Sequence, residues 1–162
     1  MSLAQDLLEQ AEHLANRDGA NPKQASLRRA VSTAYYALFH LLIDEAVGNW
    51  SVPRHRGKLA RTFDHGSMKR VCDDCVKSFY SAGKPASQLL LREVAETFSE
   101  LQLKRHTADY DNSYIWTRAI GQEWIGRTAI AFTNWDAIRT QDESQDFLLS
   151  LFLRNLTKLT RP

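Results

Sequence analysis

The chain has 162 residues, of which 43% are hydrophobic and 25% are charged. This balance is typical of a folded globular domain, and an aromatic content of 10% excludes a chain too polar to form a core. With 21 Lys and Arg against 19 Asp and Glu, the net charge is only +2, so any nucleic-acid-binding surface must be local. The length favours a single domain over residues 1–162.

No apolar stretch approaches the roughly 20 residues that a membrane-spanning helix needs. Residues 1–20 form an acidic amphipathic pattern without the basic and apolar regions of a secretory leader. We therefore expect a cytoplasmic protein with no membrane partner. Cys72 and Cys75 lack a second cysteine pair, and a zinc site would need His55 and His65 to join them, so we expect reduced core thiols, no metal and no cofactor.

Apolar residues recur every three or four positions along most of the chain, and no segment shows the strict alternation of a strand. The expected helices cover, in chain order, about residues 3–16, 22–47, two parts of 53–80, 86–108 and 113–139, and a last helix starts within residues 140–144. Their short connections predict an all-α fold, an antiparallel bundle of about five or six helices.

Glycine, proline and short polar residues predict where several of these helices begin and end. Gly19 supplies a left-handed position after the first helix, and Asn21 followed by Pro22 is typical of a helix start. Residues 81–85 are expected to separate two helices, and residues 109–113 are rich in residues that form caps and turns. We therefore expect the helix over about 86–108 to end before Asp109.

One candidate site lies on the second helix. Arg28, Ser32, Tyr36 and His40 are four residues apart and form one row beside an apolar stripe. A guanidinium, a hydroxyl, a phenol and an imidazole in one row can bind phosphate and move protons. The alternative is that Tyr36 and His40 are core side chains whose polar ends are satisfied locally.

A second candidate site follows the strongest apolar stripe. Arg105 can hold a phosphate bidentately, His106 can act as acid or base, and Tyr110 can stack on a base or donate a proton. Asp109 can orient Arg105 or His106, or cap the following segment. The alternative is structural, because cations near a helix C-terminus are stabilised by its exposed carbonyl groups.

The most basic local run is Arg54, His55, Arg56, Lys58 and Arg61. It either tracks a phosphate backbone or forms a solvated helix face. His65, at a helix break, is either an exposed imidazole beside a cleft or a turn residue.

Aromatic residues are concentrated near the C-terminal end. Trp116, Trp124 and Trp135 lie within one long expected helix, where they serve either core packing or a dimer seam. With Phe147, Phe152 and several leucines, these helices carry more apolar surface than a minimal bundle needs. We therefore expect a homodimer.

Three elements of the sequence together resemble the HEPN superfamily, in particular its small bacterial members. In chain order they are Arg28-Arg29-Ala30-x-Ser32-x-Ala34-Tyr35-Tyr36-Ala37-x-Phe39-His40, Phe63-Asp64-His65-Gly66 and Arg105-His106-x-Ala108-Asp109-Tyr110. The similarity covers residues 20–139. It implies an antiparallel helical bundle, often dimeric, whose relatives either cleave RNA without metal or bind nucleotides or partner proteins.

The ribonuclease members of this superfamily carry an Arg and a His four to six residues apart, with two copies facing across a dimer. Here Arg105 is followed at that distance by Tyr110, so this spacing is not present, and His106 directly follows Arg105.

Two functions stay open. The first is an RNA- or nucleotide-binding protein, with a toxin-type metal-independent ribonuclease as its enzymatic form. The second is a noncatalytic module that partners a nucleotidyltransferase-like antitoxin or another protein. The catalytic residues assigned are Arg105, His106, Asp109 and Tyr110. The nucleic-acid-binding residues assigned are Arg28, Tyr36, His40, His65, Arg54 and Arg56.

Overall fold

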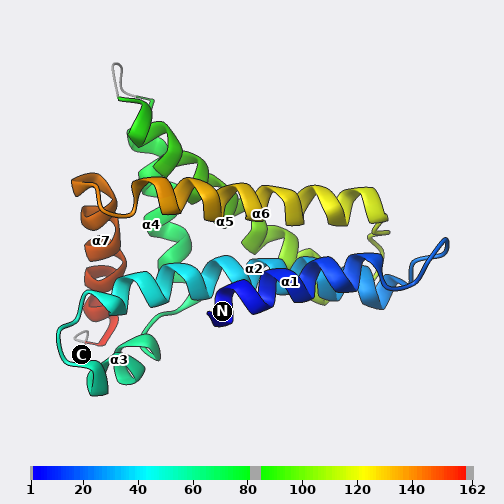
Figure 1. The fold of residues 1–162 in the computed structure, drawn as a ribbon, viewed down its shortest axis with the longest axis horizontal. Coiled ribbons are helices and arrows are strands. Elements are labelled where there is room, and N and C mark those ends of the chain that lie inside the picture. Colours follow the sequence, from blue (N-terminus) through cyan, green and yellow to red (C-terminus); the bar gives the residue numbers. More distant parts are fainter. Residues whose placement is uncertain (1, 81–84, 160–162) are drawn as a thin grey trace. The chain divides into compact units, whose positions relative to one another are not determined.

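A computed structural model of the protein describes residues 2–80 and 85–159, with side chains as far as residue 154. Every regular element in these residues is a helix, which confirms the all-α prediction (Figure 1). In the described part of the chain there are seven helices, one in each segment expected to be helical, whereas a bundle of about five or six helices was expected. None of the described helices combines the length and apolar character that crossing a bilayer requires. In chain order, the helices are α1 (Leu3–Asn16), α2 (Gln24–Gly48), α3 (Pro53–Ala60), α4 (His65–Ser78), α5 (Ala86–Tyr110), α6 (Arg118–Ile138) and α7 (Asp142–Leu159).

The chain packs as two compact units. The first unit comprises residues 1–40 and 97–133, and the second comprises residues 41–96 and 134–162. Helices α2, α5 and α6 each contribute residues to both units. The expectation of a single domain over the whole chain stays a prediction.

The start of α2 differs from the prediction. The helix begins at Gln24, and Pro22 lies outside it. The reason is a longer-range cap, because the carboxylate of Asp18 accepts a hydrogen bond from the backbone N–H of Lys23 at 3.1 Å. A hydrogen bond from the Ser26 side chain is the main reason that the pKa of Asp18 lies below its ordinary value. The acidic side chain thus caps the helix from six residues before its first residue.

Other helix boundaries follow their local signals. Gly19 has a φ of 60°, the left-handed conformation expected after α1, and α3 begins at Pro53. The predicted break near His65 is also present: Asp64 caps α4 by accepting a hydrogen bond from Ser67 N–H at 2.9 Å. The predicted break over residues 81–85 lies almost wholly outside the described residues.

The end of α5 corrects a second prediction. The helix continues through Asp109 to Tyr110, so both residues are helical and Asp109 does not cap the next segment. The turn is made by Asp111, whose carboxylate accepts hydrogen bonds from the backbone and hydroxyl of Ser113 at 2.9 and 2.6 Å. These bonds hold the pKa of Asp111 below its ordinary value. Helix α6 starts only at Arg118.

Small side chains build one part of the core of the first unit. Helices α1, α2 and α6 meet there, and alanines allow helices to approach closely. Leu8 and Leu14 pack against this cluster at its margin. Its buried members are Ala11, Ala15, Ala30, Ala34 and Ile125.

The tryptophans are core residues of a single chain. Trp116, Trp124 and Trp135 are only 1%, 6% and 1% exposed. In the second unit, the ring of Trp135 lies 6.3 Å from that of Phe147, centroid to centroid. Core packing is therefore confirmed for these residues, and they do not form a dimer seam. The homodimer stays a prediction.

Arg28 ties α2 to the end of α5 and to the segment that follows. Its Nη1 donates to the carbonyl oxygen of Ala108 at 3.1 Å, and its Nη2 donates to those of Asp111 and Tyr114 at 2.8 and 3.1 Å. The last carbonyls of a helix have no partner within the helix, so these bonds satisfy groups that otherwise need water. The guanidinium predicted to bind nucleic acid is thus engaged within the chain.

A reciprocal amide pair fixes the same segment. Gln24 Nε2 donates to the carbonyl oxygen of Trp116 at 2.7 Å, and the Trp116 N–H donates to Gln24 Oε1 at 2.9 Å. Arg118 donates to the carbonyl oxygens of Ala15 and Gly19. The connection between α5 and α6 is therefore anchored at several points in the first unit.

These contacts predict that Arg28 contributes to the stability of the fold. We expect Arg28→Ala to lower the free energy of unfolding by about 1–3 kcal/mol, because several charge-assisted hydrogen bonds are lost together. The neighbouring Arg29 is exposed, so Arg29→Ala should change it by less than about 0.5 kcal/mol. Urea unfolding followed by circular dichroism measures both values. Equal stabilities of the two variants would contradict the role of Arg28.

Candidate functional site

The last two turns of α5 bring four of the predicted site residues together. Residues four apart lie on one helix face. Arg105 Nε donates to Asp109 Oδ2 at 3.1 Å, and the ring centroids of His106 and Tyr110 are 4.9 Å apart. Tyr110 is 66% exposed, whereas only 16% of the Arg105 side chain is. The two pairs form because α5 continues to Tyr110.

Helix α2 completes the surroundings of Arg105. The guanidinium carbon lies 5.7 Å from the ring centroid of Tyr35 and 5.6 Å from that of Tyr36. Tyr36, a member of the row predicted on the second helix, thus lies near Arg105 of the second candidate site. Cation–π contact with two rings and the bond to Asp109 hold the guanidinium from two directions. Among the described residues its Nη1 and Nη2 find no hydrogen-bond partner, so both remain available to a ligand.

We call this set the α5 cluster. It contains Arg105, His106, Asp109 and Tyr110 from α5 together with Tyr36 from α2.

The predicted row on α2 divides into different roles. Arg28 binds backbone carbonyls and Tyr36 contacts Arg105. His40 is half-buried with its ring 5.5 Å from that of Phe39, and no contact to Arg105 is found among the described residues. Ser32 is buried, and its hydroxyl has no hydrogen-bond partner in the described part of the chain. Such groups are rare in folded proteins, and a bound water or a functional role accounts for many of them.

The remaining predicted residues lie in the second unit. Arg54 is exposed on α3, while Arg56 Nε donates to the carbonyl oxygen of Trp50 at 2.9 Å. The indole N–H of Trp50 donates to His55 Nδ1 at 3.3 Å, and the ring is 47% exposed. His65 is half-buried at the first position of α4.

Trp50 was missed by the sequence reasoning. It stands outside any periodic apolar stripe, four residues before the start of the most basic run, and that position is the available signal. An exposed indole beside arginines is a combination that single-stranded nucleic acids use for stacking and phosphate contact.

The cysteines do not add a site. Cys72 is fully buried, and burial raises the pKa of its thiol well above the ordinary value, so the reactive thiolate is disfavoured. Cys75 is half-buried. Over residues 2–80 and 85–154, no group of three or more His, Cys, Asp or Glu side chains is arranged to hold a metal ion.

Comparison with protein-family models, with curated proteins and with solved structures finds no match for this chain. The α5 cluster combines a guanidinium held by Asp109 and two tyrosine rings with an exposed imidazole and an exposed phenol from the same end of α5, groups suited to a phosphate and to a base.

The surroundings of Arg105 predict a small effect of a conservative change on folding. We expect Arg105→Lys to lower the free energy of unfolding by less than about 1 kcal/mol, because lysine keeps a cation near Asp109 and the two tyrosines. Urea unfolding beside Arg28→Ala tests this. A loss as large as that of Arg28→Ala would make Arg105 a residue that holds the fold.

Proposed function

We propose that this protein is a HEPN-like RNA- or nucleotide-binding protein and that the α5 cluster is its binding site. One observation carries the proposal: the guanidinium of Arg105 is positioned by Asp109 and Tyr36, yet its terminal nitrogens are unbound among the described residues. The sequence resemblance adds support, since the motif Arg105-His106-x-Ala108-Asp109-Tyr110 supplies four of the five residues.

Each group has a separate part in binding. The fork of Arg105 matches two oxygens of a phosphate, and the fixed Nε–Asp109 bond reduces the freedom that the side chain loses when it binds. Tyr110 exposes most of its ring and can stack on a base. His106, in contact with that ring, adds a group that can donate or accept a proton.

Metal-independent RNA cleavage makes further demands. It requires a base for the 2′-hydroxyl, an acid for the leaving oxygen and a cation for the charge on the phosphorane. Arg105 suits the last role, and His106 and Tyr110 are groups of the α5 cluster that can donate or accept a proton. A toxin-type ribonuclease is thus the enzymatic form of the proposal.

The second candidate function is a noncatalytic module that partners a nucleotidyltransferase-like antitoxin or another protein. It is favoured by the absence of a His four to six residues after Arg105. For both candidate functions we propose that the protein is a cytoplasmic homodimer.

RNA binding is the direct test. We expect Arg105→Lys to weaken binding of a fluorescein-labelled single-stranded RNA roughly tenfold, because lysine cannot form the bidentate fork. Arg127→Lys is the matched control, since Arg127 also pairs with a carboxylate, Glu100, and lies over an aromatic ring, that of Trp124 at 4.4 Å. Fluorescence anisotropy measures both affinities. Equal weakening by both variants, or by neither, would exclude the α5 cluster as the site.

Cleavage is tested separately from binding. With EDTA present, we expect the wild-type protein to cut the labelled RNA slowly and His106→Ala to lose at least about a hundredfold in rate, the lower end of what a proton-transfer group contributes. Its affinity for RNA should change little. Binding without any cleavage by the wild type would favour the noncatalytic form, and neither binding nor cleavage would favour the protein-partner function.

A further inference from the structure

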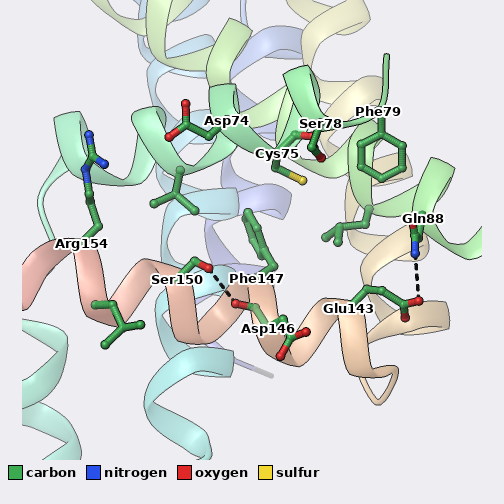
Figure 2. A pocket seen from close by; sticks show the side chains of 13 residues that line it. Asp74, Cys75, Ser78, Phe79, Gln88, Glu143, Asp146, Phe147, Ser150 and Arg154 are labelled. Carbon is green, nitrogen blue, oxygen red and sulfur yellow. Dashed lines mark hydrogen bonds between the residues drawn. The ribbon is translucent and has the colours of Figure 1, made fainter. Parts of the chain in front are cut away.

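The second unit contains an open groove between α4 and α7, to which the start of α5 also contributes lining residues (Figure 2). Its volume is about 550 Å³. No residue assigned to RNA binding lines it, so the proposed RNA site does not account for this groove.

The floor of the groove is apolar. Val71, Leu91 and Phe147 line it and are almost fully buried. Figure 2 shows the ring of Phe147 between the two helices, pointing toward α4 and Cys75. At the rim, Leu153 also lines the groove and is 54% exposed. An exposed leucine continuous with an apolar floor is typical of a surface that another molecule covers.

The rim is negatively charged. Asp74 from α4 and Glu143 and Asp146 from α7 line the groove, against a single cation, Arg154. Glu143 accepts a hydrogen bond from Gln88 at 2.9 Å, and this bond keeps its pKa below the ordinary value. In the described part of the chain, neither Asp74 nor Asp146 has an ion-pair partner. Three carboxylates around an apolar floor complement a ligand that is both apolar and cationic.

The groove is long enough for a helix. Its lining extends along α7 from Glu143 to Arg154, about 16 Å at the rise of an α-helix, and along α4 from Val71 to Ser78, about 10 Å. These lengths correspond to two or three turns of helix. Two neighbouring helices with an apolar hollow between them form the usual seat for the apolar face of a third helix.

We propose that this groove binds an amphipathic helix of a partner protein, with apolar residues at every third or fourth position and flanking lysines or arginines. Its occupant is not RNA, because a polyanion is repelled by the carboxylates at the rim. A second copy of α7 also fits poorly, since it brings Asp142 and its own Glu143 and Asp146 to a rim that is already negative.

The test uses a pair of model peptides and the full chain. One is an amphipathic peptide of leucine, alanine and lysine about 18 residues long, a length that supports a helix, and its twin has glutamate at every lysine position. By fluorescence anisotropy we expect the lysine peptide to bind with a Kd on the order of tens of micromolar and to weaken as salt is added. The glutamate twin should not bind. Equal binding of the two peptides, or binding of neither, overturns the proposal.

Exposed rim residues allow the charge to be reversed without disturbing the core. The double variant Asp74→Lys with Asp146→Lys should reverse the preference, binding the glutamate peptide and losing the lysine peptide. Asp136→Lys is the matched control, because Asp136 is exposed on α6 and does not line the groove. A double variant that keeps the preference of the wild type, or a control that changes it, overturns the proposal.

Cys75 and Leu153 allow peptide binding to be measured at the groove itself. Both line it, so a saturating lysine peptide should slow alkylation of Cys75 by iodoacetamide severalfold, as followed by mass spectrometry. Leu153→Ser should weaken peptide binding at least severalfold while thermal unfolding shows a folded protein. Alkylation at an unchanged rate with the peptide bound, or undiminished affinity of Leu153→Ser, places the peptide elsewhere and overturns the proposal.

Discussion

The hydrogen bonds from Arg28 to the carbonyls at and beyond the end of α5 are the constraint on which the candidate site depends. They join the first turns of α2 to the last turn of α5, with Ala108 as the acceptor within the helix. Because the two helices run in opposite directions at this contact, Tyr36, two turns further along α2, meets Arg105, about one turn earlier on α5. The connection to α6 is fixed by the same guanidinium through Tyr114. The position of Arg105 relative to its tyrosines therefore follows from satisfying carbonyl groups at a helix end.

Two arginines in the same unit thus have opposite roles. The terminal nitrogens of Arg28 donate to backbone carbonyl oxygens, and these hydrogen bonds stabilise the fold. Arg105 is held through Nε and through the faces of Tyr35 and Tyr36, so its terminal nitrogens keep their capacity to donate. Guanidinium groups have five N–H donors, and which of them are already engaged decides whether the residue can bind a ligand. An arginine whose terminal N–H groups are all engaged within the chain is structural, whereas one whose terminal N–H groups have no partner can bind a phosphate.

The net charge of +2 conceals surfaces of opposite character. The α5 cluster presents a guanidinium and an imidazole, and α3 presents arginines beside the exposed Trp50. The groove between α4 and α7 instead carries three carboxylates over an apolar floor. Chemistry of the first kind suits an anion such as RNA, and that of the second suits a cationic, apolar partner. A small total charge therefore excludes neither kind of ligand.

Local sequence determined the helices and some of their ends. The three-to-four-residue apolar period identified the helical regions other than α3, which was expected from Pro53 and the break near His65. Gly19 and Pro53 marked boundaries that the structure has. Residue spacing also grouped Arg105, His106, Asp109 and Tyr110, since neighbours along a helix are set by its pitch. Only tertiary structure decided that Asp109 continues α5, that Arg28 binds carbonyls and that the tryptophans are buried. The partners of Arg28 lie 80 and more residues away in sequence. Periodicity shows which face of a helix is apolar. It does not show which other helix covers that face, or where an apolar face is left uncovered as a groove, because both depend on packing between segments that are distant in the sequence.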